Sequence, residues 1–354
     1  MWRRMTEMGR RAARKTCSTK FVVVTLLGLL GQPTPAAAQS QPRIRLATPA
    51  PAGTSYHHIL QEMGEKWRHA PGGGVLLTIY PGAQMGSEAD MVRRMRVGQI
   101  QAAMVTVTGL SEIDPATSAL QKMPMMFRSL EEVDYVRSQL QPELERRLLE
   151  KGFVVLFWGD AGWVRFFSRA PASRPQDFKR MKMFVGAGDN DQSEIMKAAG
   201  YRPVALEWSD ALTGLQTGMI DALPTVPVAA LAGQFYGVAR HMLEVNWVPL
   251  VGATVVTRKA WEALPPATRE ALAAAAREAG QKMETRSRAE ANEAVEAMRR
   301  RGLQVHAVSP EIEAEWRRVA EEFYPQIRGR MVPAEMFDQV WRVLAEYRAA
   351  RAAR

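Results

Sequence analysis

Two similar blocks of short apolar runs and amphipathic segments follow one another along this 354-residue chain. In the first block, the apolar runs have the length of buried strands, and the segments between them repeat apolar positions with the period of a helix. The strands are expected at residues 44–48, 75–80 and 102–107. Helices are expected at residues 54–68, with a stripe of Ile59, Leu60, Met63 and Trp67, and after Ser87, a suitable N-cap residue. The block therefore predicts a βαβαβ unit, which builds an open α/β sheet.

The second block, from Ser173 to Pro227, repeats this pattern. Its strands are expected at residues 183–185 and 203–206, with a third after Met219-Ile220. Its helices are expected at residues 191–199 and from Ser209 to a stop at Gly218. Two such units in one chain predict two α/β lobes, and the ligands of such sheets bind beyond the carboxyl ends of the strands.

The rest of the chain connects and covers the two units. Strands that cross between the lobes are expected at residues 153–158, 163–168 and 250–257. Residues 267–301 are rich in helix formers and contain Gly280 as their only glycine, which predicts one long helix or a kinked pair. A short strand at 303–308 and helices at 310–324 and 333–347 follow. The resulting division is a signal peptide (1–38), a first lobe (39–161 plus 250–289) and a second lobe (162–249 plus 290–354).

The first 38 residues have the order of a secretory signal peptide. Basic residues from Arg3 to Lys20 precede the apolar run Phe21–Leu30, and small residues follow up to Ala38. An apolar run of about ten residues is too short to span a bilayer, which takes roughly 20; a buried helix or a membrane anchor is the alternative. We expect cleavage after Ala38, a mature protein that begins at Gln39, localisation in the periplasm and no direct membrane insertion.

Charge and cysteine content exclude several function classes. The formal charge of +10 falls to +4 without residues 1–38, since 40 lysines and arginines then face 36 acidic residues. These charges are mixed along helices, so no nucleic-acid partner is expected. The single cysteine, Cys17, leaves with the signal peptide, which excludes a disulfide or a thiolate metal site in the mature chain. Nucleotide-binding and nucleophile motifs are absent, and the five histidines lack the spacing of metal ligands, so we expect no catalytic residue, no cofactor and no metal.

Several segments, in order along the chain, are similar to one protein family. They are IYPGAQMGSE (Ile79–Glu88), LQKMPMMFRSLEE (Leu120–Glu132), RPQDFKRMKMFV (Arg174–Val185) and LQTGMID (Leu215–Asp221). From about Ile44 onward, the chain resembles the DctP-type solute receptors of TRAP transporters. The resemblance implies an α/β, two-lobed periplasmic binding protein of the Venus-flytrap type, with a long helix and C-terminal helices strapping the lobes. It also implies a receptor, not an enzyme, that captures a small-molecule ligand between the lobes and delivers it to the small and large TRAP membrane subunits.

The resemblance also implies ligand contacts, and here the chain departs from the family pattern. In such receptors, an arginine on the strand after the D-L-K-x-[LM]-K turn binds the ligand carboxylate, and its place is taken by Phe184. A second arginine aligns with Val164, next to Arg165. A polar Gln-Glu-Asn-Pro segment is replaced within Ala222–Pro227.

These departures allow two interpretations. In the first, the cleft is rebuilt for an apolar or weakly polar ligand, with aromatic walls and a few hydroxyls. In the second, Arg165 still binds a carboxylate. A periplasmic ligand sensor for a signalling partner is a further alternative with the same fold, whereas a periplasmic hydrolase would need a nucleophile and base that the sequence does not offer. The residues expected to contact the ligand are Trp208, Phe184, Trp163, Val164, Arg165, Trp158, Thr106, Thr108, Thr225 and Glu88.

Overall fold

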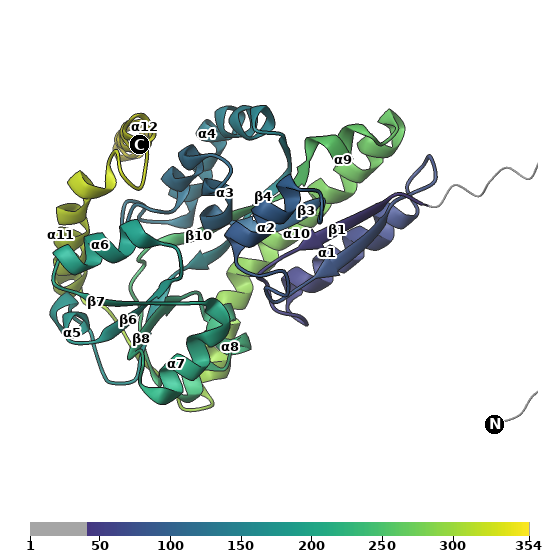
Figure 1. Ribbon diagram of the computed structural model, residues 1–354. Coiled ribbons are helices and arrows are strands. Elements are labelled where there is room, and N and C mark those ends of the chain that lie inside the picture. The colour runs from purple at the N-terminus through teal and green to yellow at the C-terminus, as the bar shows by residue number, and fades with distance from the viewer. Residues whose placement is uncertain (1–40, 354) are drawn as a thin grey trace, which may run out of the picture. The chain divides into compact units, whose positions relative to one another are not determined.

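The computed structural model describes residues 41–353 (Figure 1). The expected signal peptide, its cleavage after Ala38 and the single cysteine, Cys17, lie outside the described residues. Within residues 41–353 the chain forms a 5-stranded and a 6-stranded β-sheet with helices around them. Each sheet contains one of the two βαβαβ units expected from the sequence.

The first sheet holds the N-terminal unit. Its strands, in spatial order, are β2 (Leu76–Tyr80), β1 (Arg43–Ala47), β3 (Ala102–Thr106), β10 (Pro249–Thr257) and β4 (Phe153–Trp163). Strands β2, β1 and β3 are parallel, whereas β10 runs antiparallel to β3 and β4. The connecting helices are α1 (Ser55–Arg68), which buries its expected stripe, and α2 (Glu88–Arg96). Ser87 caps α2 as expected, because its hydroxyl accepts a hydrogen bond from the N–H of Asp90 while the Asp90 carboxylate accepts one from the N–H of Ser87.

The second sheet repeats this arrangement. Its strands, in spatial order, are β11 (Gln304–His306), β9 (His241–Leu243), β5 (Arg165–Ser168), β8 (Ala222–Thr225), β6 (Lys182–Gly186) and β7 (Arg202–Leu206). The run β7-β6-β8-β5 corresponds to β2-β1-β3-β10, since parallel strands are followed by an antiparallel one in both. The connecting helices are α6 (Asn190–Ala198) and α7 (Ala211–Thr217), and Gly218 ends α7 in the left-handed conformation, as expected. The duplication of the unit is confirmed.

The remaining helices cover the sheets or join them. They are α3 (Val107–Ser111), η1 (Pro115–Leu120), α4 (Leu130–Glu150), α5 (Pro175–Lys179), η2 (Trp208–Asp210), α8 (Pro227–Ala232), η3 (Phe235–Gly237), α9 (Arg258–Glu262), α10 (Pro266–Arg299), α11 (Pro310–Ile327) and α12 (Ala334–Ala352), where η marks a 3₁₀ helix. The predicted fold class, an α/β protein with two sheets, a long helix and C-terminal helices, is confirmed.

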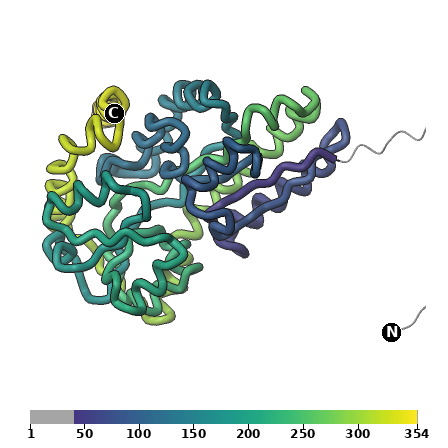
Figure 2. Tube along the Cα trace, in the orientation of Figure 1, coloured from purple at the N-terminus to yellow at the C-terminus, as the bar shows by residue number. Residues whose placement is uncertain are grey.

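Helix α10 is one continuous helix of 34 residues, which decides between the two alternatives that the sequence left open. It packs against α1 and β4, and also against α8, which follows β8 of the second sheet. Its Met283 belongs to the hydrophobic cluster of β1 and α1, and its Met298 belongs to the cluster of β5 and β8. The helix therefore joins the two units, and the green part of the trace passes from one to the other (Figure 2).

Two local expectations were wrong. Strand β4 continues to Trp163, beyond its expected end, because β10 pairs with it that far, and β5 begins only at Arg165. Ser209 does not cap α7, because residues 208–210 form a 3₁₀ turn and the helix begins at Ala211. The limits of the two lobes stay a prediction.

Helix α4 is absent from the sequence prediction. Pro142 lies inside its 21 residues, and a proline within a helical pattern normally indicates a break. Its buried stripe nevertheless has helical spacing and would have revealed the helix. The stripe consists of Val133, Val136, Leu140, Leu144 and Leu148.

Candidate functional site

A cavity of about 830 Å³ lies beyond the carboxyl ends of the parallel strands of both sheets. Its wall contains the segments that follow β1, β2 and β3 in the first sheet, and those that follow β6, β7 and β8 in the second. Strands β4 and β10 and helix α11 also contribute to the wall. This is the position expected of a ligand site in open α/β sheets, and the size suits a small molecule.

Most of the predicted contact residues line this cavity. They are Glu88, Thr106, Thr108, Val164, Phe184, Trp208 and Thr225. Trp158 and Trp163, by contrast, are buried in the hydrophobic core and do not line the cavity. The indole N–H of Trp158 donates a hydrogen bond to Glu145 of α4 at 3.0 Å. The structure therefore places these two tryptophans in packing positions rather than on the cavity wall.

Aromatic rings form part of the wall at the ends of β6 and β7. Phe184 meets the half-buried Trp208 edge-on, with 5.8 Å between the ring centroids. Trp208 in turn meets Phe235 edge-on at 5.3 Å. These contacts fix the indole in place, so it offers a preformed apolar surface to the cavity.

Arg165 itself does not line the cavity, and it lies on the same face of the second sheet as Phe184. Phe167, two residues along β5, packs in one hydrophobic cluster with Phe184 and Leu223, and alternate strand residues share a face. Arg165 pairs in register with Thr225, the last residue of β8, which lines the cavity. The guanidinium is half-buried and makes no hydrogen bond or ion pair within residues 41–353. Burial lowers the pKa of Arg165, although the charge of Glu244 opposes this shift.

Glu88 and Thr106, two of the predicted contact residues, are hydrogen-bonded to each other. The Glu88 carboxylate accepts hydrogen bonds from the Thr106 N–H at 2.6 Å, from its hydroxyl at 2.9 Å and from the Gly109 N–H at 3.1 Å. Burial raises the pKa of Glu88, and these hydrogen bonds act against the shift. The carboxylate thus joins the start of α2 to the start of α3 and shapes the cavity wall.

Lys122 is a cavity residue that the sequence analysis did not single out. It is the one basic side chain among the described residues that line the cavity. Its ammonium group lies 3.4 Å from the Asp189 carboxylate, and both side chains are largely buried. Lys122 lies within the LQKMP segment, which was interpreted only through its family resemblance.

Carboxylates outnumber cations on the cavity wall. They are Glu88, Asp90, Glu112, Asp160, Asp189 and Glu207. Four of them have partners in the protein. Asp90, Asp160 and Asp189 form ion pairs with Arg93, Arg288 and Lys122, respectively, and Glu88 accepts hydrogen bonds from hydroxyl and N–H donors. The carboxylates of Glu112 and Glu207 belong to exposed residues, where solvent screens their charge. The excess of acids therefore leaves little unbalanced charge inside the cavity.

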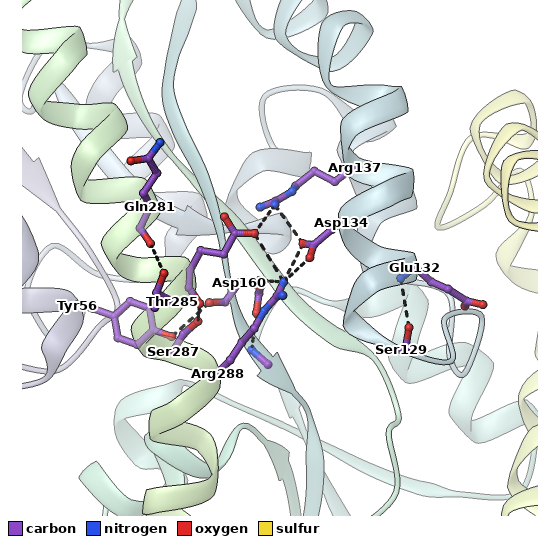
Figure 3. Close-up of polar contacts among 12 residues, drawn as sticks. Tyr56, Ser129, Glu132, Asp134, Arg137, Asp160, Gln281, Thr285, Ser287 and Arg288 are labelled. Carbon is purple, nitrogen blue, oxygen red and sulfur yellow. Dashed lines mark hydrogen bonds and ion pairs between the residues drawn. The ribbon is translucent and has the colours of Figure 1, made fainter. Parts of the chain in front are cut away.

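A nearby acidic cluster is held by arginines and has the contacts of a structural joint (Figure 3). Oxygens of Asp134, Asp160 and Glu284 lie within 4.8 Å of one another. Arg288 donates to Asp134 at 2.7 and 2.8 Å and to Asp160 at 3.2 Å. Arg137 donates to Asp134 at 3.1 Å and to Glu284 at 2.9 Å. These cations neutralise the carboxylates that a metal would need, so the cluster instead ties α4, β4 and α10 together.

Two buried hydroxyls on the cavity wall have no hydrogen-bond partner within residues 41–353. They belong to Tyr201, which precedes β7, and Thr254, in the middle of β10. Burial raises the pKa of Tyr201 to about 12. Sequence patterns do not reveal such groups, because one tyrosine or threonine in an apolar stretch is typical of an ordinary core position.

Comparison with known sequences identifies the family. The sequence model described as "Bacterial extracellular solute-binding protein, family 7" (DctP) matches residues 46–329, most of the chain. The chain belongs to this family. The resemblance to DctP-type receptors that the sequence motifs indicated is therefore confirmed.

Relatives of this family 7 protein agree with the assignment. The C4-dicarboxylate-binding periplasmic protein DctP of Rhodobacter capsulatus is 24% identical over 273 residues, which are 77% of this chain and 81% of that protein. A TRAP periplasmic solute-binding protein from Shewanella oneidensis with bound succinate gives a TM-score of 0.79 at 18% identity, covering 86% of this chain and 100% of that one. One from Ralstonia eutropha H16 with bound (S)-2-acetolactate gives 0.79 at 19% identity, covering 86% and 99%. These structures show the same fold.

The family assignment fixes the general role of the protein. It is a TRAP-type periplasmic solute-binding protein and not an enzyme. Among residues 41–353, each helix is too short or too polar to cross a bilayer. The family assignment confirms the expected periplasmic localisation and the receptor role.

Proposed function

We propose that this DctP-type receptor captures an organic carboxylate in the cavity and delivers it to small and large TRAP membrane subunits. The observation that carries this proposal is Arg165, a half-buried guanidinium without a hydrogen bond or ion pair within residues 41–353, paired in register with the cavity residue Thr225. The relatives support it, since the Rhodobacter protein is named for C4-dicarboxylates and the Shewanella structure holds succinate.

A half-buried guanidinium without a protein partner is unfavourable, because it has lost part of its water and no protein group replaces that part. Its lowered pKa reports the same cost. A carboxylate would offset it with paired, charge-assisted hydrogen bonds, for which the planar guanidinium is suited. Arg165 therefore has the chemistry to replace the arginine that the family pattern places at Phe184.

Lys122 is the second candidate for contact with the carboxylate. Its separation of 3.4 Å from Asp189 is longer than the 2.7–2.9 Å typical of a strong charge-assisted hydrogen bond. The ammonium group thus keeps donors for a ligand oxygen. Because the pair already balances its own charge, we expect Lys122 to contribute less than Arg165.

The apolar-ligand interpretation is less well supported for the whole ligand. Phe184, Val164 and Trp208 do line the cavity, as that interpretation requires. However, apolar walls are common in sites that also bind a charged group through a few polar side chains. The aromatic wall is therefore compatible with a carboxylate.

Titration calorimetry on purified protein tests the proposal. The ligands are succinate, galacturonate and octanoate; galactose is the uncharged counterpart of galacturonate, and octanol is that of octanoate. We expect at least one acid to bind more tightly than its counterpart. Arg165→Ala should weaken that acid by about ten- to a hundredfold, since a charged hydrogen bond contributes about 1.5–3 kcal/mol.

Arg169→Ala is the matched control, because Arg169 is exposed and follows the opposite end of β5 from Arg165. It should change the affinity less than twofold. Trp208→Ala should reduce the affinity for the acid by a smaller factor than Arg165→Ala does. Unchanged acid binding in Arg165→Ala, with binding abolished in Trp208→Ala, would overturn the carboxylate proposal and restore the apolar one.

A further inference from the structure

The wall of the cavity includes apolar residues from α6 and α11 and from the turns after these helices. We define an α6–α11 chamber by the cavity-lining residues Ile195, Met196, Tyr201, Phe323, Ile327 and Met331. Ile195 and Met196 come from α6, Phe323 and Ile327 from α11, and the other two from the turns that follow these helices. All belong to, or pack against, one hydrophobic cluster.

The six residues that define the chamber carry a single polar side-chain group. None of its six defining residues is charged, and the Tyr201 hydroxyl is their only side-chain nitrogen or oxygen. Tyr201 is only 7% exposed, and its hydroxyl has no hydrogen-bond partner within residues 41–353. Interiors are normally packed without voids, and buried polar groups normally have a partner. An apolar space with one unpartnered hydroxyl is therefore suited to a ligand rather than to core packing alone.

The chamber lies within reach of the charged part of the cavity. Asp189, which pairs with Lys122, stands at the start of α6, and Ile195 follows six residues later. At 1.5 Å per residue, this separation along the helix is about 9 Å. Such a distance is comparable to the length of an extended chain of roughly eight carbons. One molecule can thus place a carboxylate near Lys122 and an apolar chain in the chamber.

The outer side of the chamber is fastened by ion pairs. Arg330, in the turn after α11, donates to Asp191 of α6 at 2.9 Å and also contacts Glu194. These exposed contacts hold the end of α11 against α6. The chamber therefore lies between two elements that ion pairs join at the end of α11.

We infer that the α6–α11 chamber accepts the apolar tail of an amphipathic carboxylate, an acid that carries an alkyl or aryl chain. The position of its head group rests on the proposed carboxylate function, whereas the chamber itself does not. A compact acid of the size of succinate leaves the chamber empty. A longer acid buries its tail there and gains affinity from apolar burial.

The test is a chain-length series on the unaltered protein, with butanoate, hexanoate and octanoate in titration calorimetry at one ionic strength. Each methylene that enters the chamber should raise the affinity about fourfold, so octanoate should bind about two hundredfold more tightly than butanoate. 4-Phenylbutanoate should also bind more tightly than butanoate. An affinity that does not rise along the series would overturn the chamber, even if short acids bind.

A filled chamber provides the second test. Met196→Trp places a large side chain at the half-buried wall, and Met219→Trp is the matched control on an exposed methionine that does not line the cavity. Met196→Trp should reduce the affinity for octanoate at least tenfold and change the affinity for butanoate less than threefold. Met219→Trp should change neither affinity. Equal octanoate binding in Met196→Trp and the unaltered protein would contradict the inference. If Met196→Trp does not fold, the chain-length series decides alone.

The two proposals fail in different ways. If octanol binds as tightly as octanoate and the affinity still rises with chain length, the result supports the chamber and contradicts the carboxylate function. If acids bind with a strict need for Arg165 and without dependence on chain length, the carboxylate function stands and the chamber falls. Tyr201→Phe adds a direct readout, because it should weaken 8-hydroxyoctanoate relative to octanoate if the tail ends at this hydroxyl.

Discussion

Replacing Gly280 by alanine should destabilise the protein, although alanine is the better helix former. Gly280 is the only glycine within α10, and it faces Phe157 of β4. A methyl group there would lie 2.8 Å from Cβ and 3.1 Å from Cγ of Phe157, whereas carbon atoms in contact are about 3.5–4.0 Å apart. These two atoms are fixed close to the strand backbone, so rotation of a flexible side-chain end cannot relieve the clash.

Two effects of opposite sign set the magnitude. The helix propensity of alanine should stabilise α10 by about 1 kcal/mol relative to glycine. Overpacking in a close-packed interior typically costs about 1–3 kcal/mol. We therefore expect the free energy of unfolding to fall by about 1 kcal/mol, with a decrease of about 2 °C in Tm.

Urea denaturation followed by tryptophan fluorescence measures this change. The double mutant with Phe157→Leu is informative, because a smaller side chain at 157 makes room for the methyl group. The loss in the double mutant should be smaller than the sum of the two single losses. If Gly280→Ala were more stable than the unaltered protein by about 1 kcal/mol, propensity would dominate and the packing argument would be refuted.

The remaining predictions concern two ion pairs. Burial alone would raise the pKa of Glu132, but the hydrogen bonds and charge of Arg348 lower it below its usual value. Because the pKa of Glu132 is lower in the folded than in the unfolded state, this stabilisation is present above the unfolded pKa of about 4.3 and is lost as the pH falls through the folded pKa. Urea denaturation should therefore show that the difference in the free energy of unfolding between the unaltered protein and Glu132→Gln shrinks below about pH 4. Asp160→Asn should lower the free energy of unfolding by about 2 kcal/mol, because it leaves part of the Arg288 charge uncompensated. The exposed Asp338→Asn is its control, and an equal effect in both variants would contradict a special role for Asp160.

Much of the fold could be predicted from the sequence, because the spacing of apolar residues and the residues that begin or end a helix reflect local physics. The stripe of α1 from Ile59 to Trp67, the cap at Ser87 and the stop at Gly218 are each encoded within a few residues, and all three are confirmed. The start of α7 was less accessible, since a 3₁₀ turn and an α-helix have similar local patterns. The pairing of β10 with β4 was not accessible either, because it joins strands far apart in the chain.

The cavity was harder to predict than the fold. Its wall is assembled from segments that follow strands in both sheets, and no sequence spacing reports that Lys122 meets Asp189. Tyr201 shows the same limit, because only the surroundings of its hydroxyl distinguish it from a core tyrosine. The aromatic position at Trp208 was accessible through the family resemblance, and the structure does place it on the wall.

The position of Arg165 gives a second way to interpret the departure from the family pattern at Phe184. At the place where the family pattern has an arginine, on β6, this chain has Phe184, which suggested that a carboxylate contact was lost. Face alternation places Arg165 on the same side of the sheet as Phe184, and its register partner Thr225 is the last residue of β8, on the cavity wall. An arginine on β5 can therefore place a positive charge at the same end of the sheet as an arginine on β6 would. If Arg165 binds the carboxylate as proposed, the aromatic wall and this charged group act on one ligand that is both apolar and acidic.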